Sequence, residues 1–196
     1  MTDRISTSAL DQLFLEARSQ NAWQDKEVSD DVLMELIDIT KMGPTSANCC
    51  PARFVFAKSK ESRERLAAHV SQGNVRKVME ASACAIIGHD LEFYEHLPRL
   101  FPHTDAKSWF EGNEENIKTT AFRNGTLQGA YFMIAARALG LDVGPMSGFD
   151  NEAVDKDFFA GTQIKSNFIC SIGQGDPSAL FGRSPRFDFS DMAEIL

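Results

Sequence analysis

The sequence predicts a single domain, residues 1–196, in which α-helices are combined with a β-sheet. The chain holds 43% hydrophobic and 10% aromatic residues, which is enough apolar material for one core of ordinary size. Segments with strand periodicity alternate with segments of helical periodicity, without an internal repeat or an interdomain linker. The nucleotide-binding patterns GxGxxG and GxxxxGK followed by Ser or Thr are absent, so a nucleotide cofactor would need another mode of binding.

The N-terminal half predicts helices, a loop and two strands. The clearest signals surround the second helix, where Ser29 is a typical N-cap, acidic residues fill the first turn, and Gly43 can close the last turn before Pro44. The loop that follows is bounded by prolines, and its backbone and hydroxyl groups are free to bind a ligand. The predicted elements are helix 8–20, helix 30–43, loop 44–51, strand 52–58, helix 59–70, helix 73–82 and strand 83–90.

The C-terminal half is dominated by one long helix. From about Glu114 to Leu139 its apolar residues occupy more than one face, which is typical of a helix in a core or in a dimer interface. The segment before it is rich in aromatic, proline and histidine residues without a clear period, and is interpreted as a partly helical lid or pocket wall. The predicted elements are lid 91–112, helix 114–139, strand and turn 141–150, helix 151–159, strand 166–175 and an extended arm 176–196.

The charge balance narrows the class of partners. The formal net charge is −8 and the sequence pI is near 5.0, so the overall field repels nucleic acids and anionic membranes. The longest apolar runs fall far short of the ~20 residues of a membrane-spanning helix. The first residues lack the apolar segment of a secretory signal. We therefore expect a cytoplasmic protein without nucleic-acid or membrane partners.

The cysteines and histidines predict no metal site. The histidines show no HExxH spacing and have no cysteine nearby in a metal-ligand pattern. The cysteines show no CxxC spacing and are interpreted as free thiols in a reducing compartment. They are Cys49, Cys50, Cys84 and Cys170.

Small or cationic residues gather at a few predicted loops and helix ends. Each group alone is also typical of an ordinary surface feature, such as a solvated helix end, a turn or a surface lysine. The groups are Arg18-Ser19-Gln20, Pro44-Thr45-Ser46-Ala47-Asn48, Asn74-Val75-Arg76-Lys77, Gly144-Pro145-Met146-Ser147-Gly148 and, in the tail, Arg183.

In this order and spacing the groups resemble the nitroreductase family, from Arg18 to the Arg183-Ser184-Pro185 tail. The stretches GPTSANC, EFYEHLPRLFPH, SWF, TAFRN and ARALGLDVGPMSGFD are similar to a subgroup that contains the malonic-semialdehyde reductase of the pyrimidine-utilisation pathway. The resemblance implies an α+β fold with a central, mostly antiparallel sheet flanked by helices, a long core helix at a homodimer interface and an extended C-terminal arm. It also implies FMN as cofactor and NADH or NADPH as co-substrate.

The resemblance assigns residues to the phosphate end of FMN. Arg18 and Arg183 would bind the phosphate, because a dianion needs charge-assisted donors. Ser19-Gln20 would add hydrogen bonds near the ribityl chain or the phosphate. Many family members carry further cations at positions that are Ala22 and Phe181 here. Cationic support is therefore thinner in this chain, and Arg76 is a candidate to compensate.

Other residues would surround the flavin ring, and some would come from a partner subunit. Asn74 and Lys77 would lie against the pyrimidine edge, where a lysine stabilises the negative charge of the reduced flavin. The segment Pro145-Met146-Ser147-Gly148 would pass the ring at N5, where its last two N–H groups can donate to N5 or O4. The partner subunit of the homodimer would contribute Thr45, Ser46 and Asn48.

The implied reaction needs no catalytic side chain, because the flavin carries the hydride at N5 and the protein positions the reactants. NAD(P)H would reduce the flavin and leave, and the small-molecule acceptor would then occupy the same open pocket in a ping-pong cycle. An acidic aldehyde would need a cation for its carboxylate and a proton donor for its carbonyl oxygen. His103, Lys107 and Arg123 are the candidates, although each residue is also typical of a surface or structural position.

Three functions stay open at this point. The first is an enzyme of this family, which reduces malonic semialdehyde to 3-hydroxypropionate in the specific case and nitroaromatics or quinones in the broader case. The second is a flavin-binding or redox-sensing module with little turnover. The third, a structural domain without a cofactor, would give a colourless protein.

Overall fold

A four-stranded antiparallel sheet lies at the centre of the computed structural model, which describes residues 3–196; residues 1 and 2 of the predicted domain lie outside it. The strands follow the order β1-β2-β4-β3, and each neighbouring pair is antiparallel. β2 is buried along its whole length, which explains its run of small and apolar residues. The strands are β1 (Ala52–Ala57), β2 (Ala83–Asp90), β3 (Asp142–Met146) and β4 (Ile164–Gly173).

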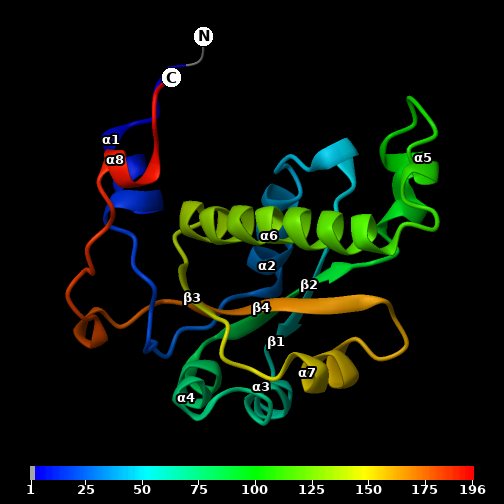
Figure 1. The fold of residues 1–196 in the computed structure, drawn as a ribbon. Helices are drawn as coiled ribbons and strands as arrows, with labels where there is room; N and C mark the ends of the chain where they lie inside the picture. Colours follow the sequence, from blue (N-terminus) through cyan, green and yellow to red (C-terminus); the bar gives the residue numbers. More distant parts are fainter. Residues whose placement is uncertain (1–2) are drawn as a thin grey trace.

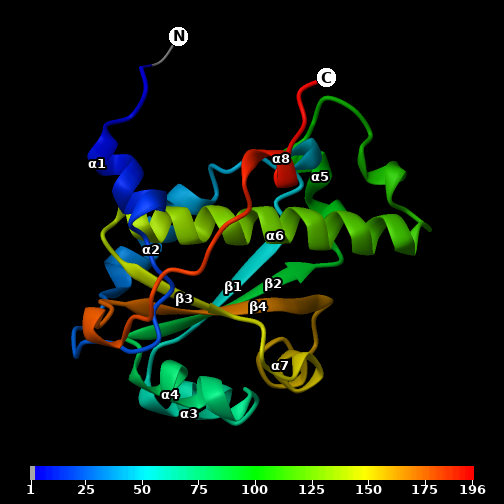
Figure 2. The ribbon, with the colours of Figure 1, turned by 60° about the vertical axis from the view of Figure 1, so that its left-hand side comes forward.

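Helices cover both faces of the sheet (Figures 1 and 2). The long helix α6 (Glu114–Ala138) crosses one face together with α2 (Asp30–Thr40). The opposite face is covered by α3 (Lys60–Ala67), α4 (Gln72–Glu80) and α7 (Asn151–Phe158). The sheet thereby forms the middle layer of three.

Two hydrophobic cores lie on the two sides of the sheet, because successive side chains of a strand point to opposite faces. Ala85 and Ile87 of β2 pack in the cluster with α2 and α6. Cys84 and Ile86 of the same strand pack in the cluster with α3, α4 and α7. A third cluster, which includes Phe93, lies under the segment before α6.

Short helical turns occupy the ends of the chain and the predicted lid. The short elements are α1 (Thr7–Leu10), the π-helical turn Asp11–Leu15, the 3-10 turns Ser46–Asn48, Phe93–His96, Lys107–Trp109 and Pro177–Ala179, and the helices α5 (Leu97–Leu100) and α8 (Phe189–Met192).

None of the helices within residues 3–196 combines the length and apolar character needed to cross a membrane.

The predicted α+β fold with an antiparallel sheet is confirmed, and so is the long helix before β3. The helix predicted for 8–20 is wrong in its second half, because helical structure ends at Leu15. Ser19 instead forms a parallel bridge with Val143, so the chain pairs with the open edge of β3. In the strand and turn predicted for 141–150, the strand covers Asp142–Met146. The strand predicted for 166–175 begins and ends two residues earlier, at Ile164 and Gly173.

Candidate functional site

The N-terminal segment and α4 are both attached to the β3 side of the sheet. The Gln20 N–H donates to the Val143 carbonyl oxygen at 3.0 Å, next to the bridge made by Ser19. Trp23 Nε1 donates to the Lys77 carbonyl oxygen at 3.1 Å. The structure therefore brings the predicted groups around Arg18, Asn74 and Pro145 to one side of the molecule. Trp23 was not among the residues that the sequence motifs singled out.

The turn after β3 is shaped by a contact between Asn74 and Gly148. Asn74 Nδ2 donates to the Gly148 carbonyl oxygen at 3.0 Å, and the Ser71 N–H donates to the same oxygen at 2.8 Å. A methyl group at Gly148 would lie 2.8 Å from Asn74 Nδ2, so glycine permits this close approach. The N–H groups of Ser147 and Gly148 find no acceptor among residues 3–196. They are available to donate to a ligand.

Pro145 and Met146 belong to β3 itself instead of the predicted turn. They pair with Cys170 and Ile169 of β4. The Met146 side chain is buried in the cluster with α3, α4 and α7. Its backbone, and not its side chain, is therefore the part that can face a ligand.

The two cations of α4 differ in their partners. Arg76 Nε lies 2.7 Å from Glu80 Oε1, so its charge is already neutralised, and this contact raises the pKa of Arg76. Lys77 is half-buried and forms no ion pair within the part of the chain that the structure describes. Lys77 has no carboxylate that competes with a ligand, whereas Arg76 is paired with Glu80; a role of Arg76 in cofactor binding stays a prediction.

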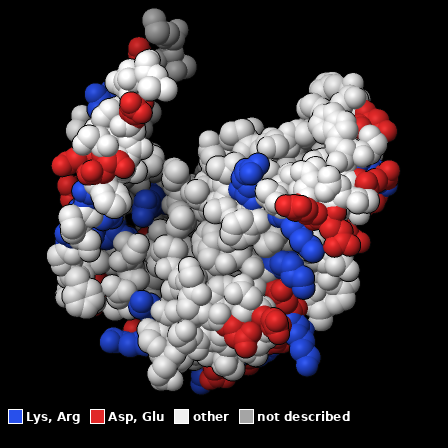
Figure 3. All heavy atoms as spheres, in the orientation of Figure 1, with Lys and Arg blue, Asp and Glu red and all other residues white. Residues whose placement is uncertain are grey.

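A cavity of about 250 Å³ lies between the N-terminal segment and the C-terminal arm, and three arginines line it. Arg18 Nη2 donates to the Phe181 carbonyl oxygen at 2.6 Å, and Arg183 Nη2 donates to the Leu15 carbonyl oxygen at 2.6 Å. The third is Arg186, which donates to carbonyl groups of its own segment. Figure 3 shows Lys and Arg atoms on the left-hand part of the molecule, where these two segments run.

The arginines of this cavity have no counter-ion in the described chain. Arg18, Arg183 and Arg186 form no ion pair with a carboxylate among residues 3–196, and they bond to neutral carbonyl groups instead. Burial is the main cause that lowers the pKa of Arg137 at the end of α6; the Asp142 carboxylate raises this pKa, and the Arg183 guanidinium lowers it. Such a site favours an anion.

Arg186 was missed by the sequence reasoning, which counted Ala22 and Phe181 as lost cations. Ala22 is buried, and Phe181 contributes its carbonyl oxygen to Arg18. The available signal was the spacing of two arginines within four residues of the tail. Ser19 lines the same cavity, and its role near the phosphate stays a prediction.

Gln20 lies beneath the surface and not in the arginine cavity. Its side chain is buried, and Nε2 donates to Asp142 Oδ1 at 3.2 Å. The side-chain oxygen Oε1 has no partner in the described chain. A methyl group at Gly175 would collide with this side chain, so the glycine makes room for it. Gln20 therefore positions the segment that carries Arg18.

The predicted group Thr45, Ser46 and Asn48 lies elsewhere in this chain. The Ser46 N–H donates to Asn124 Oδ1 of α6 at 2.8 Å, and Asn48 Nδ2 donates to the Leu100 carbonyl oxygen at 2.8 Å. These bonds tie the loop to α6 and the lid instead of to β3. The loop also holds non-glycine residues with positive φ, a strain that is commonly associated with function. They are Ala47 (49°), Asn48 (49°) and Cys50 (40°).

The substrate candidates also lie away from β3. His103 is exposed in the lid, with its ring centroid 5.5 Å from that of Phe101. Lys107 Nζ lies 2.7 Å from Glu95 Oε2, and this bond raises the pKa of the lysine. Arg123 is exposed on the outer face of α6 and forms no ion pair among residues 3–196. Lys107 is therefore paired with a carboxylate, whereas Arg123 is not.

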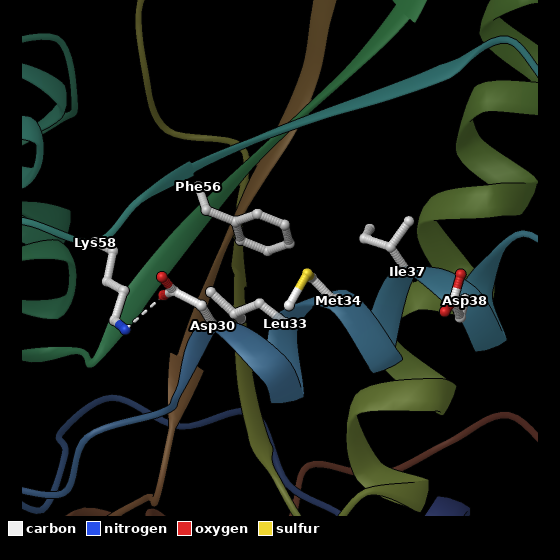
Figure 4. Close-up of a pocket in the computed structure, with 7 residues that line it drawn as sticks. All are labelled: Asp30, Leu33, Met34, Ile37, Asp38, Phe56 and Lys58. Carbon is white, nitrogen blue, oxygen red and sulfur yellow. Dashed lines mark hydrogen bonds and ion pairs between the residues drawn. The ribbon is translucent and has the colours of Figure 1, made fainter.

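A second, larger cavity of about 560 Å³ lies between α2 and β1 (Figure 4). Leu33, Met34 and Ile37 of α2 face Phe56 of β1 across it. Its cation is Lys58, whose Nζ lies 2.7 Å from an oxygen of Asp30 and 3.1 Å from one of Glu27. None of the predicted site residues lines this apolar groove. A charge that is already paired does not favour an anionic cofactor there.

The arrangement of the sheet and helices is that of the nitroreductase fold. A solved structure of YdfN from Bacillus subtilis, provisionally described as a nitroreductase, matches with a TM-score of 0.88 at 22% identity, over 97% of this chain and 100% of that chain. A nitroreductase from Exiguobacterium sibiricum, provisionally named and solved in complex with FMN, matches with a TM-score of 0.86 at 19% identity over the whole of both chains.

The sequence comparisons give the family. The profile of the nitroreductase family matches residues 15–174, and the chain belongs to this family. A relative from Burkholderia lata, provisionally named an NADH dehydrogenase/NAD(P)H nitroreductase, is 64% identical over 97% of this chain and 98% of the relative. The family predicted from the sequence motifs is thereby confirmed, while the malonic-semialdehyde subgroup stays a prediction.

Proposed function

We propose that this chain is an FMN-dependent oxidoreductase that uses NADH or NADPH to reduce a small organic acceptor. The main support for the proposal is the set of hydrogen-bond donors that lie on the β3 side of the sheet. Arginines without counter-ions lie in one cavity, and the free N–H groups of Ser147 and Gly148 lie after the strand. The name of the relative from Burkholderia lata and the FMN complex of the neighbour from Exiguobacterium sibiricum point the same way.

The donors present fit the chemical groups of FMN. A phosphate dianion needs several charge-assisted donors, and Arg18, Arg183 and Ser19 line one cavity. The edge of the flavin ring needs N–H donors, which Ser147 and Gly148 can provide. The free charge of Lys77 would stabilise negative charge on the reduced cofactor. Bound FMN supplies the hydride-transfer chemistry, so no side chain needs to act as an acid or base in that step.

We also propose that the site is completed in a homodimer. Ser46 and Asn48 are held by α6 and the lid, and Thr45 lies in the same loop, so these residues can reach the β3 side only from a second copy. The outer face of α6 exposes large apolar side chains that a second copy would cover. They are Phe122 (54% exposed) and Leu127 (45%), which line one surface cavity.

Malonic semialdehyde is the first acceptor to test, with nitroaromatics and quinones as the broader alternative. The resemblance of the lid sequence to the malonic-semialdehyde reductase subgroup supports the specific choice. Arg123 supports it physically, because it is an exposed cation without a carboxylate partner in the described chain and could bind the carboxylate of an acidic aldehyde.

The test is an anaerobic spectroscopic titration of protein reconstituted with FMN. We expect NADH or NADPH to bleach the flavin absorbance and malonic semialdehyde, a quinone or a nitroaromatic to restore it, with the recovery rates ranking the acceptors. Full bleaching followed by slow recovery with every acceptor would favour the flavin-binding module. Failure of the purified chain to retain FMN would contradict the proposed function.

A further inference from the structure

We propose that Arg186 adds a third cation to the phosphate site of Arg18 and Arg183, and that a phosphate group bound there fastens the C-terminal arm to the N-terminal segment. The proposal rests on the proposed function, since the phosphate is that of FMN. It adds Arg186 as a cofactor-binding residue and gives the arm a conformational role.

The arm and the N-terminal segment are joined by reciprocal hydrogen bonds, in which an arginine of each segment donates to carbonyl oxygens of the other. Arg18 reaches the carbonyl oxygen of Phe181 in the arm, and Arg183 of the arm reaches back to the carbonyl oxygens of Leu15 and Ala17. All arm residues from 181 to 196 are exposed, and none of them belongs to a strand of the sheet. These arginines are therefore a main attachment of the arm within the described chain.

The three guanidinium groups keep most of their donors free. A guanidinium carries five N–H donors, and each group here donates through a single terminal nitrogen. The acceptors are neutral carbonyl oxygens, so three like charges remain uncompensated around one cavity. A phosphate dianion accepts several forked hydrogen bonds at once. It would remove the repulsion and bridge the arm to the body.

Arg186 supplies a cation to a cavity in which this chain lacks two others. Resemblance to the family places additional cations at positions 22 and 181, and this chain has Ala22 and Phe181 instead. Arg186 lines the same cavity as Arg18 and Arg183 and has no carboxylate partner among residues 3–196. The tail thereby restores a third positive charge from a different position.

The binding test compares FMN with riboflavin, which lacks the phosphate. Apo-protein is titrated with each flavin by fluorescence quenching, for the unmodified chain, for Arg186→Gln and for the control Arg65→Gln, whose arginine lies on α3 and is paired with Asp157. We expect Arg186→Gln to weaken FMN binding about 10-fold, the lower end of the range for the loss of one charge-assisted hydrogen bond. Riboflavin affinity should stay unchanged in both variants.

The outcomes separate this proposal from the proposed function. Unchanged FMN affinity in Arg186→Gln, or an equal loss for both flavins, would overturn the phosphate role of Arg186 while leaving FMN binding intact. If the unmodified chain bound neither flavin, the proposed function itself would be contradicted, together with this proposal.

Proteolysis tests the role of the arm without measuring activity. Chymotrypsin cleaves after exposed aromatic residues, and the arm carries Phe181 (78% exposed) and Phe187 (75%). We expect saturating FMN to slow cleavage at these residues several-fold, whereas saturating riboflavin should have little effect. In Arg186→Gln the protection by FMN should be reduced. Equal protection by both flavins, or none by FMN, would contradict the fastening of the arm by phosphate.

Discussion

The two cavities differ in volume and in charge, and the smaller one is the better candidate for a cofactor phosphate. The groove between α2 and β1 measures about 560 Å³, against about 250 Å³ for the arginine cavity. In the groove, Lys58 is already bound by Asp30 and Glu27, and the other lining residues are mainly apolar. In the arginine cavity the charges are uncompensated in the described chain. Free charge, more than volume, indicates where an anionic ligand binds.

The largest expected effect is at Arg183. Replacement by Gln removes a cation from the cavity and its bond to the Leu15 carbonyl oxygen. A hydrogen bond to a charged group contributes about 1.5–3 kcal/mol, so we expect FMN to bind about 10- to 100-fold more weakly. Riboflavin affinity, measured in the same titration, should change far less. An equal loss for both flavins would show that the substitution disturbs the site as a whole.

A smaller effect is expected at the turn after β3. In Gly148→Ala the new methyl group would lie 2.8 Å from Asn74 Nδ2 and 3.0 Å from Ser71 Oγ, so the Asn74 side chain, which bonds to the turn, or the turn itself must shift. We expect the FMN dissociation constant to rise about tenfold, or about 1.4 kcal/mol.

Gly73→Ala is the matched control for that substitution. Gly73 precedes Asn74 in α4, and a methyl group there meets nothing within 4 Å. Alanine is favoured over glycine in a helix, so this variant should bind FMN normally and melt at the same or a slightly higher temperature. If both variants lost FMN equally, the close approach at Gly148 would not be the cause.

Lys77 should affect the reduction potential more than the affinity. Replacement by Gln removes a positive charge that favours the reduced flavin, and we expect the two-electron potential to fall by about 30–60 mV, which corresponds to about 1.4–3 kcal/mol. The measurement is dye equilibration during anaerobic reduction. Lys60→Gln, an exposed position on α3, is the control. A potential that does not move would place Lys77 away from the flavin.

The smallest effect is expected in the apolar groove. Lys58→Met removes a cation that is paired with Asp30 and Glu27, and pairs of this kind contribute about 0–1 kcal/mol. We expect FMN affinity within about twofold of the unmodified chain and a small change in melting temperature. A large loss of FMN affinity would move the cofactor site to the groove and reverse the comparison.

The sequence predicted elements whose signals are local. Ser29, the predicted N-cap of the second helix, accepts a hydrogen bond from the N–H group of Val32, as expected. The long helix before β3 was predicted because its apolar residues extend over more than one face, and the structure buries much of it against the sheet.

Elements that depend on distant partners were missed. Residues 16–20 have helical periodicity, yet Ser19 pairs with the edge of β3, because a tertiary contact overrides local propensity. Arg186 was missed for the same reason. It is far from Arg18 in the sequence, and only the fold brings both residues to one cavity. The positive φ of Ala47 and Asn48 could not be read from a proline-bounded loop, since the bonds of that loop to Asn124 and Leu100 are also tertiary.

The most direct test of the central claim is a crystal structure of the FMN complex. We predict that the phosphate lies between Arg18, Arg183 and Arg186, that the ring edge accepts hydrogen bonds from Ser147 and Gly148, and that a second copy supplies the loop with Ser46. A flavin bound in the groove between α2 and β1, or a phosphate that none of the three arginines contacts, would contradict the account.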